Sequence, residues 1–120
     1  MIGLKNQYSL GMPSTISIDE FAKVEMRVGK VLEATNKEGS EKLIRLVVDF
    51  GEQGKRVIFT GVRGYGYTPE DFSGKQFMFA FNLAPRKMMD EESHGMILAV
   101  GDDKPIFLSA EGLPLGAKIR

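Results

Sequence analysis

Cysteine is absent from this 120-residue chain, and histidine occurs only once, at His94. Without thiols the chain cannot form a disulfide, a thiolate zinc site or a cysteine nucleophile, and one imidazole cannot provide a histidine pair for a metal. Most hydrolytic mechanisms thereby lose a required part, and we expect a protein without enzymatic activity, metal or other cofactor. A domain of this length buries roughly two thirds of the surface that its unfolded chain exposes, so it can fold without such cross-links.

Long apolar segments are absent as well. The longest uninterrupted runs, Phe77 to Phe81 and Met96 to Val100, have five residues each, whereas about 18 are needed to span a bilayer. The beginning of the chain has neither the continuous apolar segment nor the cleavage pattern of a secretory signal. We therefore expect a cytoplasmic protein that does not cross a membrane.

Net charge is missing too, because sixteen lysines and arginines balance sixteen acidic residues. Neutrality by itself argues against nucleic-acid binding. The charges are unevenly distributed, however: residues 21–87 hold twelve basic and eight acidic residues, whereas residues 88–120 hold three basic and six acidic ones. A neutral protein with such a polarised sequence can still present one positive face.

The chain reads as a single domain preceded by a short leader. Residues 1–14 contain two glycines and a proline without a periodic pattern, which indicates a flexible leader before a domain at residues 15–120. Ser17 and Glu20 have the spacing of a capping box, which predicts a short helix before the first strand. Thr68 followed by Pro69 predicts a second short helix that ends by Gly74.

Five strands are predicted by alternation and β-branched content. In the second, Ile44, Leu46 and Val48 alternate with Arg45 and Asp49, the pattern of a half-buried strand. The segment 51–54 is predicted to be the turn of a hairpin. The five segments are residues 24–34, 42–50, 55–62, 75–82 and 95–100.

Gly29 interrupts the first of these strands, and a bend or bulge there would let a curved strand serve two sheets. Five short strands, a bulged first strand and a helix between the third and fourth predict an all-β, Greek-key barrel of the OB type. A β-sandwich is the alternative.

Several features favour ordinary structural roles over chemistry. The three glycines of segment 61–67 lack the spacing of a phosphate-binding loop and indicate a turn. Asp90, Glu91 and Glu92 have no nucleophile nearby in sequence, which is typical of a solvated loop. His94 has no identifiable partner and fits a surface histidine.

A series of segments, taken in order, resembles the tRNA-binding OB domain family. Members include free-standing structure-specific tRNA-binding proteins, the C-terminal domain of bacterial methionyl-tRNA synthetases, and synthetase cofactors of the endothelial-monocyte-activating-polypeptide type. The resemblance runs from about Ile16 to Arg120. It is carried by DEFAKVEMRVGK (19–30), GSEKL (39–43), VDFG (48–51), YTPEDFSG (67–74), NLAPRK (82–87) and SHGM (93–96).

The resemblance implies a non-catalytic domain that holds tRNA by its shape and backbone, acts alone or beside an aminoacyl-tRNA synthetase, and forms a homodimer. Lysines and arginines would contact phosphates, while asparagine and serine would donate to phosphate or to the 2′-hydroxyl. The residues that the family motifs assign to the tRNA-contacting surface are Lys42, Asn82, Lys87, Ser93 and Met96. Further basic positions that could line the same groove are Arg27, Lys30, Arg45, Arg63 and Arg86.

Each motif residue also has a purely structural interpretation. Lys42 could be a solvated strand end, Asn82 and Ser93 could bond their own backbone, and Met96 could pack in the core. The three acids at 90–92 depart from the family pattern, and carboxylates beside a phosphate path would weaken RNA binding.

Two other functions fit the same fold. One is a peptide-binding secretion chaperone, which would use exposed apolar surface and shows a similar opening sequence. The other is a dimerisation module whose RNA binding has decayed, which the acidic segment would explain. In the homodimer, the apolar tail Leu113 to Ile119 would contribute to an interface with residues near Ile16.

Overall fold

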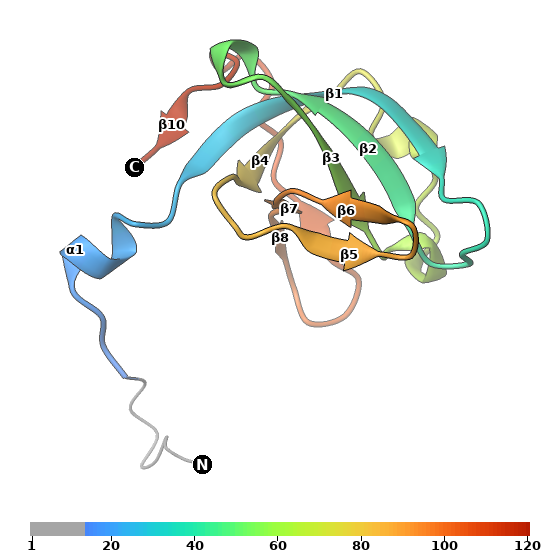
Figure 1. Cartoon of the computed structure of the whole chain (residues 1–120), viewed down its shortest axis with the longest axis horizontal. Coiled ribbons are helices and arrows are strands. Elements are labelled where there is room, and N and C mark those ends of the chain that lie inside the picture. Colours follow the sequence, from blue (N-terminus) through green and yellow to red (C-terminus); the bar gives the residue numbers. More distant parts are fainter. Residues whose placement is uncertain (1–13) are drawn as a thin grey trace.

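The computed structural model describes residues 14–120, so nearly all of the predicted leader lies outside the described residues. The regular secondary structure of the described chain is mostly β-strand, with one short α-helix and three short 3-10 helices (Figure 1). None of its helices is long and apolar enough to cross a membrane. The elements are α1 (Ile18–Phe21), β1 (Met26–Asn36), β2 (Ile44–Asp49), η1 (Gly51–Gln53), β3 (Lys55–Thr60), η2 (Arg63–Tyr65), η3 (Pro69–Asp71), β4 (Gln76–Ala80), β5 (Arg86–Met88), β6 (Glu91–Ser93), β7 (Met96–Ile97), β8 (Ala99–Val100), β9 (Ile106–Phe107) and β10 (Lys118–Ile119), where η denotes a 3-10 helix.

The long strand β1 organises the sheet, whose strands are antiparallel in the order β3-β2-β1-β4-β7. Its first half pairs with β4 and its second half with β2, and Lys30 has a partner on both sides. The strand curves across the top of the molecule in Figure 1, so the sheet wraps around a single interior. The predicted five-stranded barrel is confirmed, and β10 adds a short pairing at the start of β1.

The predicted bulge is in the wrong place. The pairing of β1 with β2 is irregular between Val31 and Glu33, whereas Gly29 lies in a regular ladder with β4. Gly29 is required for packing instead. A Cβ atom there would lie 2.6 Å from the Val48 side chain and 2.7 Å from the Phe50 ring, closer than carbon atoms approach without strain.

Two further boundaries differ from the sequence prediction. The segment 95–100 is not one strand: β7 pairs with β4, whereas β8 pairs with β9 to form a separate hairpin. The connection between β3 and β4 holds two short 3-10 helices, and Asp71 at the end of η3 completes a capping box with Thr68. The capping box of α1 is confirmed, with Ser17 and Glu20 bonding each other's backbone N–H groups.

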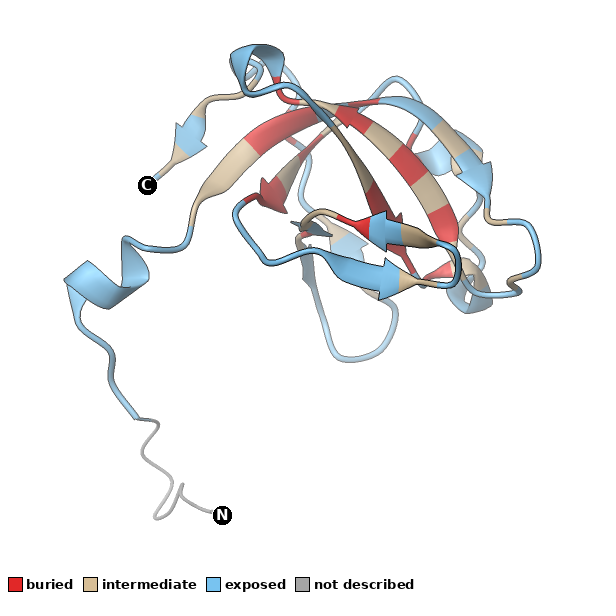
Figure 2. Cartoon of the chain, viewed as in Figure 1, coloured by how far each residue is buried: buried red, intermediate tan, exposed pale blue. Residues whose placement is uncertain are grey.

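Aromatic side chains fill the barrel interior, which Figure 2 shows as buried positions along β1, β2, β3 and β4. Phe50 packs edge-on against Phe79 and Phe81, with ring centroids 5.3 and 4.9 Å apart. At the other end, Tyr67 and Phe72 pack with Phe107. The fold thus places the core inside the barrel and leaves the outer face of β3 available to be covered by β5 and β6.

Candidate functional site

The strands β5 and β6 form a hairpin that lies in front of β3 (Figure 1). Sequence reasoning interpreted this segment as a solvated loop. Its turn consists of Met89 and Asp90, and Met89 has a left-handed φ of 61°. Two-residue hairpin turns normally carry glycine or asparagine at such positions. The hairpin therefore escaped prediction because its turn lacks the usual residues, although Lys87 and Glu92, of opposite charge, occupy facing positions on its two strands.

Ser93 attaches this hairpin to the barrel. Its side chain is 4% exposed, and its hydroxyl accepts a hydrogen bond from the Phe59 N–H at 3.0 Å and donates to the Gly95 carbonyl at 3.4 Å. The His94 N–H donates to the Val57 carbonyl at 2.9 Å. Ser93 thus bonds backbone, as its structural interpretation anticipated, and its contact with RNA stays a prediction.

Gly95 continues the attachment. Its φ is +126°, and a Cβ atom would lie 2.8 Å from the Ala80 carbonyl oxygen. Only glycine adopts such a backbone without strain. The glycine of the SHGM motif therefore lets the chain pass close against β4.

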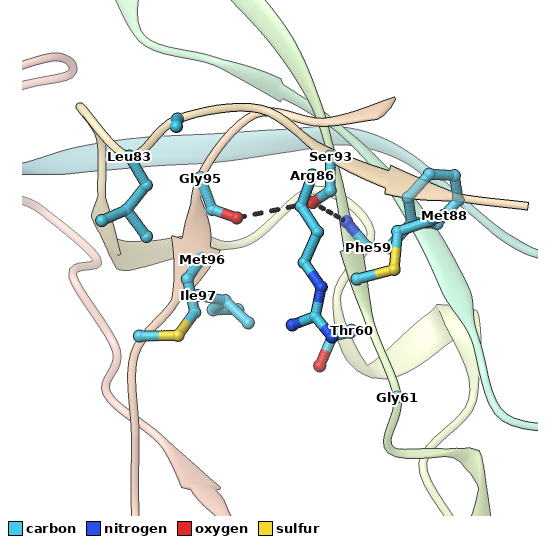
Figure 3. Close-up of a pocket in the computed structure, with 11 residues that line it drawn as sticks. Phe59, Thr60, Gly61, Leu83, Arg86, Met88, Ser93, Gly95, Met96 and Ile97 are labelled. Carbon is cyan, nitrogen blue, oxygen red and sulfur yellow. Dashed lines mark hydrogen bonds between the residues drawn. The ribbon is translucent and has the colours of Figure 1, made fainter. Parts of the chain in front are cut away.

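Between the hairpin, the end of β3 and β7 lies a cavity of about 300 Å³ (Figure 3). Three of the predicted site residues, Arg86, Ser93 and Met96, line it. The cavity is mixed in character, with apolar walls and a few polar groups, which is typical of small-ligand sites. Its other lining residues are Phe59, Thr60, Gly61, Leu83, Ala84, Met88, Gly95 and Ile97. Residues 14–120 contain no cluster of His, Asp or Glu that could hold a metal ion.

An ion-pair network holds the turn of the hairpin. Lys37 Nζ lies 2.7 Å from Asp90 Oδ1 and 2.9 Å from Glu91 Oε1, and Arg45 Nε lies 3.0 Å from the same Glu91 oxygen. Hydrogen bonds from Arg45 and then Lys37 lower the pKa of Glu91, and a bond from Lys37 lowers the pKa of Asp90. The bonds to Asp90 and Glu91 raise the pKa of Lys37.

This network changes how the acidic segment and Arg45 are interpreted. Asp90 and Glu91 neutralise two cations of the protein itself, so their charge is largely balanced before any phosphate approaches. Arg45, which the sequence suggested as a phosphate contact, is paired with Glu91. Glu92 lies 3.5 Å from His94 instead.

Replacing Glu91 by glutamine is expected to loosen the hairpin at neutral pH and to weaken its acid sensitivity. Because the folded pKa of Glu91 is depressed, its stabilising contribution is complete above its ordinary value of 4.5 and is lost as the pH falls through the lower folded value. The contribution of Lys37 is complete below its ordinary value of 10.5 and is lost as the pH rises through the higher folded value.

The measurement is the NMR chemical shift of the β6 amides between about pH 3 and pH 7. In the original protein these amides should shift together below about pH 4.5, and in Glu91→Gln this transition should shrink. Glu52→Gln, a substitution in the exposed 3-10 helix η1, is the control and should leave the transition unchanged. Equal transitions in all three proteins would show that the network does not hold the hairpin.

The remaining predicted residues lie at different distances from the cavity. Lys87 is exposed on β5, next to Arg86, and Lys42 is exposed just before β2. The Lys42 carbonyl accepts a hydrogen bond from the Arg63 N–H at 3.3 Å, and Arg63 lies two residues after Gly61, which lines the cavity. Lys42 therefore lies beside the cavity end of β3.

Asn82 and Lys30 are placed differently. The Asn82 side chain accepts from the Glu25 N–H at 2.8 Å and donates to the Lys23 carbonyl at 2.6 Å, so it fastens the segment between α1 and β1 to the end of β4. Lys30 pairs with Asp49 and Gln76, whereas the cavity lies at the opposite ends of β2 and β4. The structure thus brings Arg86, Ser93 and Met96 together at the cavity, places Lys42 and Lys87 on neighbouring segments, and leaves Lys30 apart.

Sequence reasoning missed two residues of this region. Lys37 received no role, although its ammonium joins the turn of the hairpin to the loop after β1. Thr60 was one strand residue among several, yet its side chain lines the cavity while only 9% of the residue is exposed. The one sequence signal that could have suggested the hairpin was the basic pair Arg86 and Lys87 before the methionines and the acidic residues 90–92 after them.

Comparisons with known proteins identify a family and relatives for this chain. Residues 26–118 match a family model described as "Putative tRNA binding domain". The chain is 53% identical over 91 residues to the methionine–tRNA ligase of Stenotrophomonas maltophilia R551-3, and 45% identical over 105 residues to that of Methanococcus aeolicus. These matches cover 76% and 87% of this chain but only 13% and 15% of the two ligases, so the chain spans less than a sixth of either relative.

Two solved structures share the fold over nearly the whole chain. A MetRS-related protein from Pyrococcus horikoshii superposes with a TM-score of 0.80 at 35% identity, covering 90% of this chain and all of that one. The chaperone CsaA from Bacillus anthracis superposes with a TM-score of 0.79 at 29% identity, covering 89% of this chain and all of that one.

Proposed function

The chain belongs to the tRNA-binding domain family, and from this premise we propose that it binds tRNA through the surface formed by hairpin β5–β6 and the neighbouring end of β3. The match over residues 26–118 is the observation that carries the proposal. Binding requires no catalytic step, so the domain acts by holding RNA rather than by transforming it.

The charges around the cavity support this assignment. Arg86, Lys87 and Lys42 are exposed, and within residues 14–120 none of the three forms an ion pair. Arginine and lysine side chains left unpaired in this way are suited to phosphate oxygens, which fix the position of RNA without reading its sequence. Arg45 and Lys37 are already paired with Asp90 and Glu91, so they add little positive charge to this surface.

The similarity to methionine–tRNA ligases supports a role beside an aminoacyl-tRNA synthetase in the cytoplasm. The matched segment is a small part of those ligases. A domain of this kind would raise the local concentration of tRNA near a synthetase. Once this domain holds a tRNA beside the synthetase, binding of the same tRNA to the synthetase becomes effectively intramolecular.

Peptide binding is the second candidate, supported by the similarity to the CsaA chaperone and by the exposed apolar side chains of Leu83 and Met96 at the cavity. The two candidates differ in electrostatics. Phosphate binding depends steeply on salt, whereas apolar contacts with a peptide are much less affected by it.

The deciding experiment is a titration of the purified protein with total tRNA, blunt duplex RNA and an unfolded polypeptide at about 50 and 200 mM salt. We expect saturable tRNA binding that weakens strongly at the higher concentration, with weaker binding of duplex RNA. Polypeptide binding that is insensitive to salt, with no tRNA binding, would establish the chaperone function instead.

We also propose that the protein is a homodimer. The helix α1 contains no buried residue and stands away from the barrel (Figure 1), although Ile16, Ile18 and Phe21 are large and apolar. In the tail, Leu113 and Leu115 are exposed while β10 pairs with β1. Exposed apolar groups of this kind are typical of an interface.

Analytical ultracentrifugation is expected to give a dimer at micromolar concentration, and Ile18→Asp should shift it toward the monomer because burying a carboxylate in an apolar interface is unfavourable. The barrel should keep its thermal stability in this variant, since Ile18 is 78% exposed in the single chain. A monomer for the original protein would contradict the proposal.

A further inference from the structure

The lining of the cavity beside hairpin β5–β6 includes groups that phosphate binding alone does not need. Phosphate contacts need exposed cations and donors, but this cavity has an apolar wall that includes Leu83, Met96 and Ile97. Met96 is half exposed even though it is a large apolar side chain. An exposed apolar wall beside cations is suited to a ligand that is both flat and attached to phosphate.

Thr60 provides the polar group inside. Only 9% of this residue is exposed, and its hydroxyl has no hydrogen-bonding partner among residues 14–120. Buried hydroxyls are normally hydrogen-bonded, because leaving one unpaired costs free energy. By contrast, the buried hydroxyl of Ser93 on the other wall is satisfied by backbone. The Thr60 hydroxyl is therefore available to a ligand in the cavity.

Arg86 and two methionines surround the opening. In Figure 3 the Arg86 side chain extends into the cavity, with Met96 on one side and Met88 on the other. A guanidinium plane stacks on nucleobases, and thioether side chains are polarisable and adapt to flat aromatic surfaces. The three side chains together offer a surface for stacking, and the Thr60 hydroxyl lines the same cavity.

We propose that this cavity takes up one unpaired, unstacked nucleobase of the bound RNA. The base would stack on Met96 and the Arg86 guanidinium, the Thr60 hydroxyl would bond an edge of the base, and Lys87 would contact the adjoining phosphate. This inference rests on the proposed RNA-binding function and adds to it a preference for RNA with a single-stranded nucleotide beside a duplex.

The preference is tested with two RNAs that share one duplex, one blunt and one carrying a three-nucleotide 3′ extension. We expect the extended RNA to bind about tenfold more tightly, since stacking of one base on a protein contributes about 1–3 kcal/mol. Met96→Ala should abolish this preference and leave the salt dependence of binding unchanged, because it removes stacking surface and no charge.

Met89→Ala is the matched control. Met89 and Met96 are both 50% exposed, but Met89 is in the turn of the hairpin and does not line the cavity. The control should keep the tenfold preference. Equal thermal midpoints of the two variants would show that both are folded.

Four results would overturn the inference. Salt-dependent tRNA binding without a preference for the extended RNA would disprove the base site and leave RNA binding intact. A preference that survives Met96→Ala would place the unpaired base elsewhere. Absence of binding to any RNA at low salt would disprove the proposed function itself. If an unfolded peptide competed with RNA, and Met96→Ala abolished that competition, the cavity would be assigned to peptides.

Discussion

Replacing Phe50 by alanine is expected to lower the free energy of unfolding by about 3–5 kcal/mol. Phe50 is fully buried, packs edge-on against Phe79 and Phe81, and approaches Gly29 so closely that no side chain fits at that position. Removing its ring would leave a cavity lined by side chains that have no alternative partners. Domains of this size have a total stability of about 5–15 kcal/mol, so the variant would lose a large share of its stability.

Urea denaturation followed by circular dichroism measures this effect as a shift in the midpoint. Tyr65→Ala is the control, because Tyr65 is also aromatic but is 50% exposed in the 3-10 helix η2. Its midpoint should change little. An unchanged midpoint for Phe50→Ala would show that the aromatic cluster is not a principal source of stability, and RNA affinity in the variant should fall only in proportion to the folded fraction.

Removing both Lys42 and Lys87 is expected to weaken tRNA binding about a hundredfold at low salt. Each phosphate contact contributes about 0.9 to the slope of log affinity against log salt concentration, which corresponds to about tenfold in affinity at 50 mM salt. The double alanine variant should therefore have a slope smaller by about two. Both side chains are exposed and unpaired among the described residues, so the fold should not change.

Lys55→Ala is the matched control for this experiment. Lys55 is an exposed lysine at the start of β3, opposite Asp49, whereas the cavity lies at the other end of that strand. It should leave both affinity and slope close to those of the original protein. If Lys55→Ala reduced the slope as much as Lys42→Ala, the RNA would follow a different face of the barrel.

Much of the barrel could be predicted because its signals are local. In β2, Ile44, Leu46 and Val48 are fully buried while Arg45 and Asp49 are not, as their alternation indicates. The capping box of Ser17 with Glu20 likewise depends on residues three positions apart. The order of short motifs identified the family because each motif is also a local signal, made of residues that are neighbours in the sequence.

The candidate site was less predictable because its contacts join distant residues. Lys37 and Glu91 are 54 positions apart, Arg45 and Glu91 are 46 apart, and the Asn82 amide bonds a backbone group 57 positions away. Residue type alone could not tell that, among residues 14–120, Arg45 is paired while Arg86 is not. It also could not tell that, in the same part of the chain, backbone groups satisfy the Ser93 hydroxyl but not the Thr60 hydroxyl.

Residue types and their spacing along the chain therefore determined the first four strands, the barrel and the family, because alternation, capping and motif order are properties of neighbouring residues. Only the tertiary structure decided which charges and hydroxyls are available to a ligand. The physical reason is that a cation or a hydroxyl loses its binding capacity when another part of the same chain satisfies it, and folding alone brings those parts together.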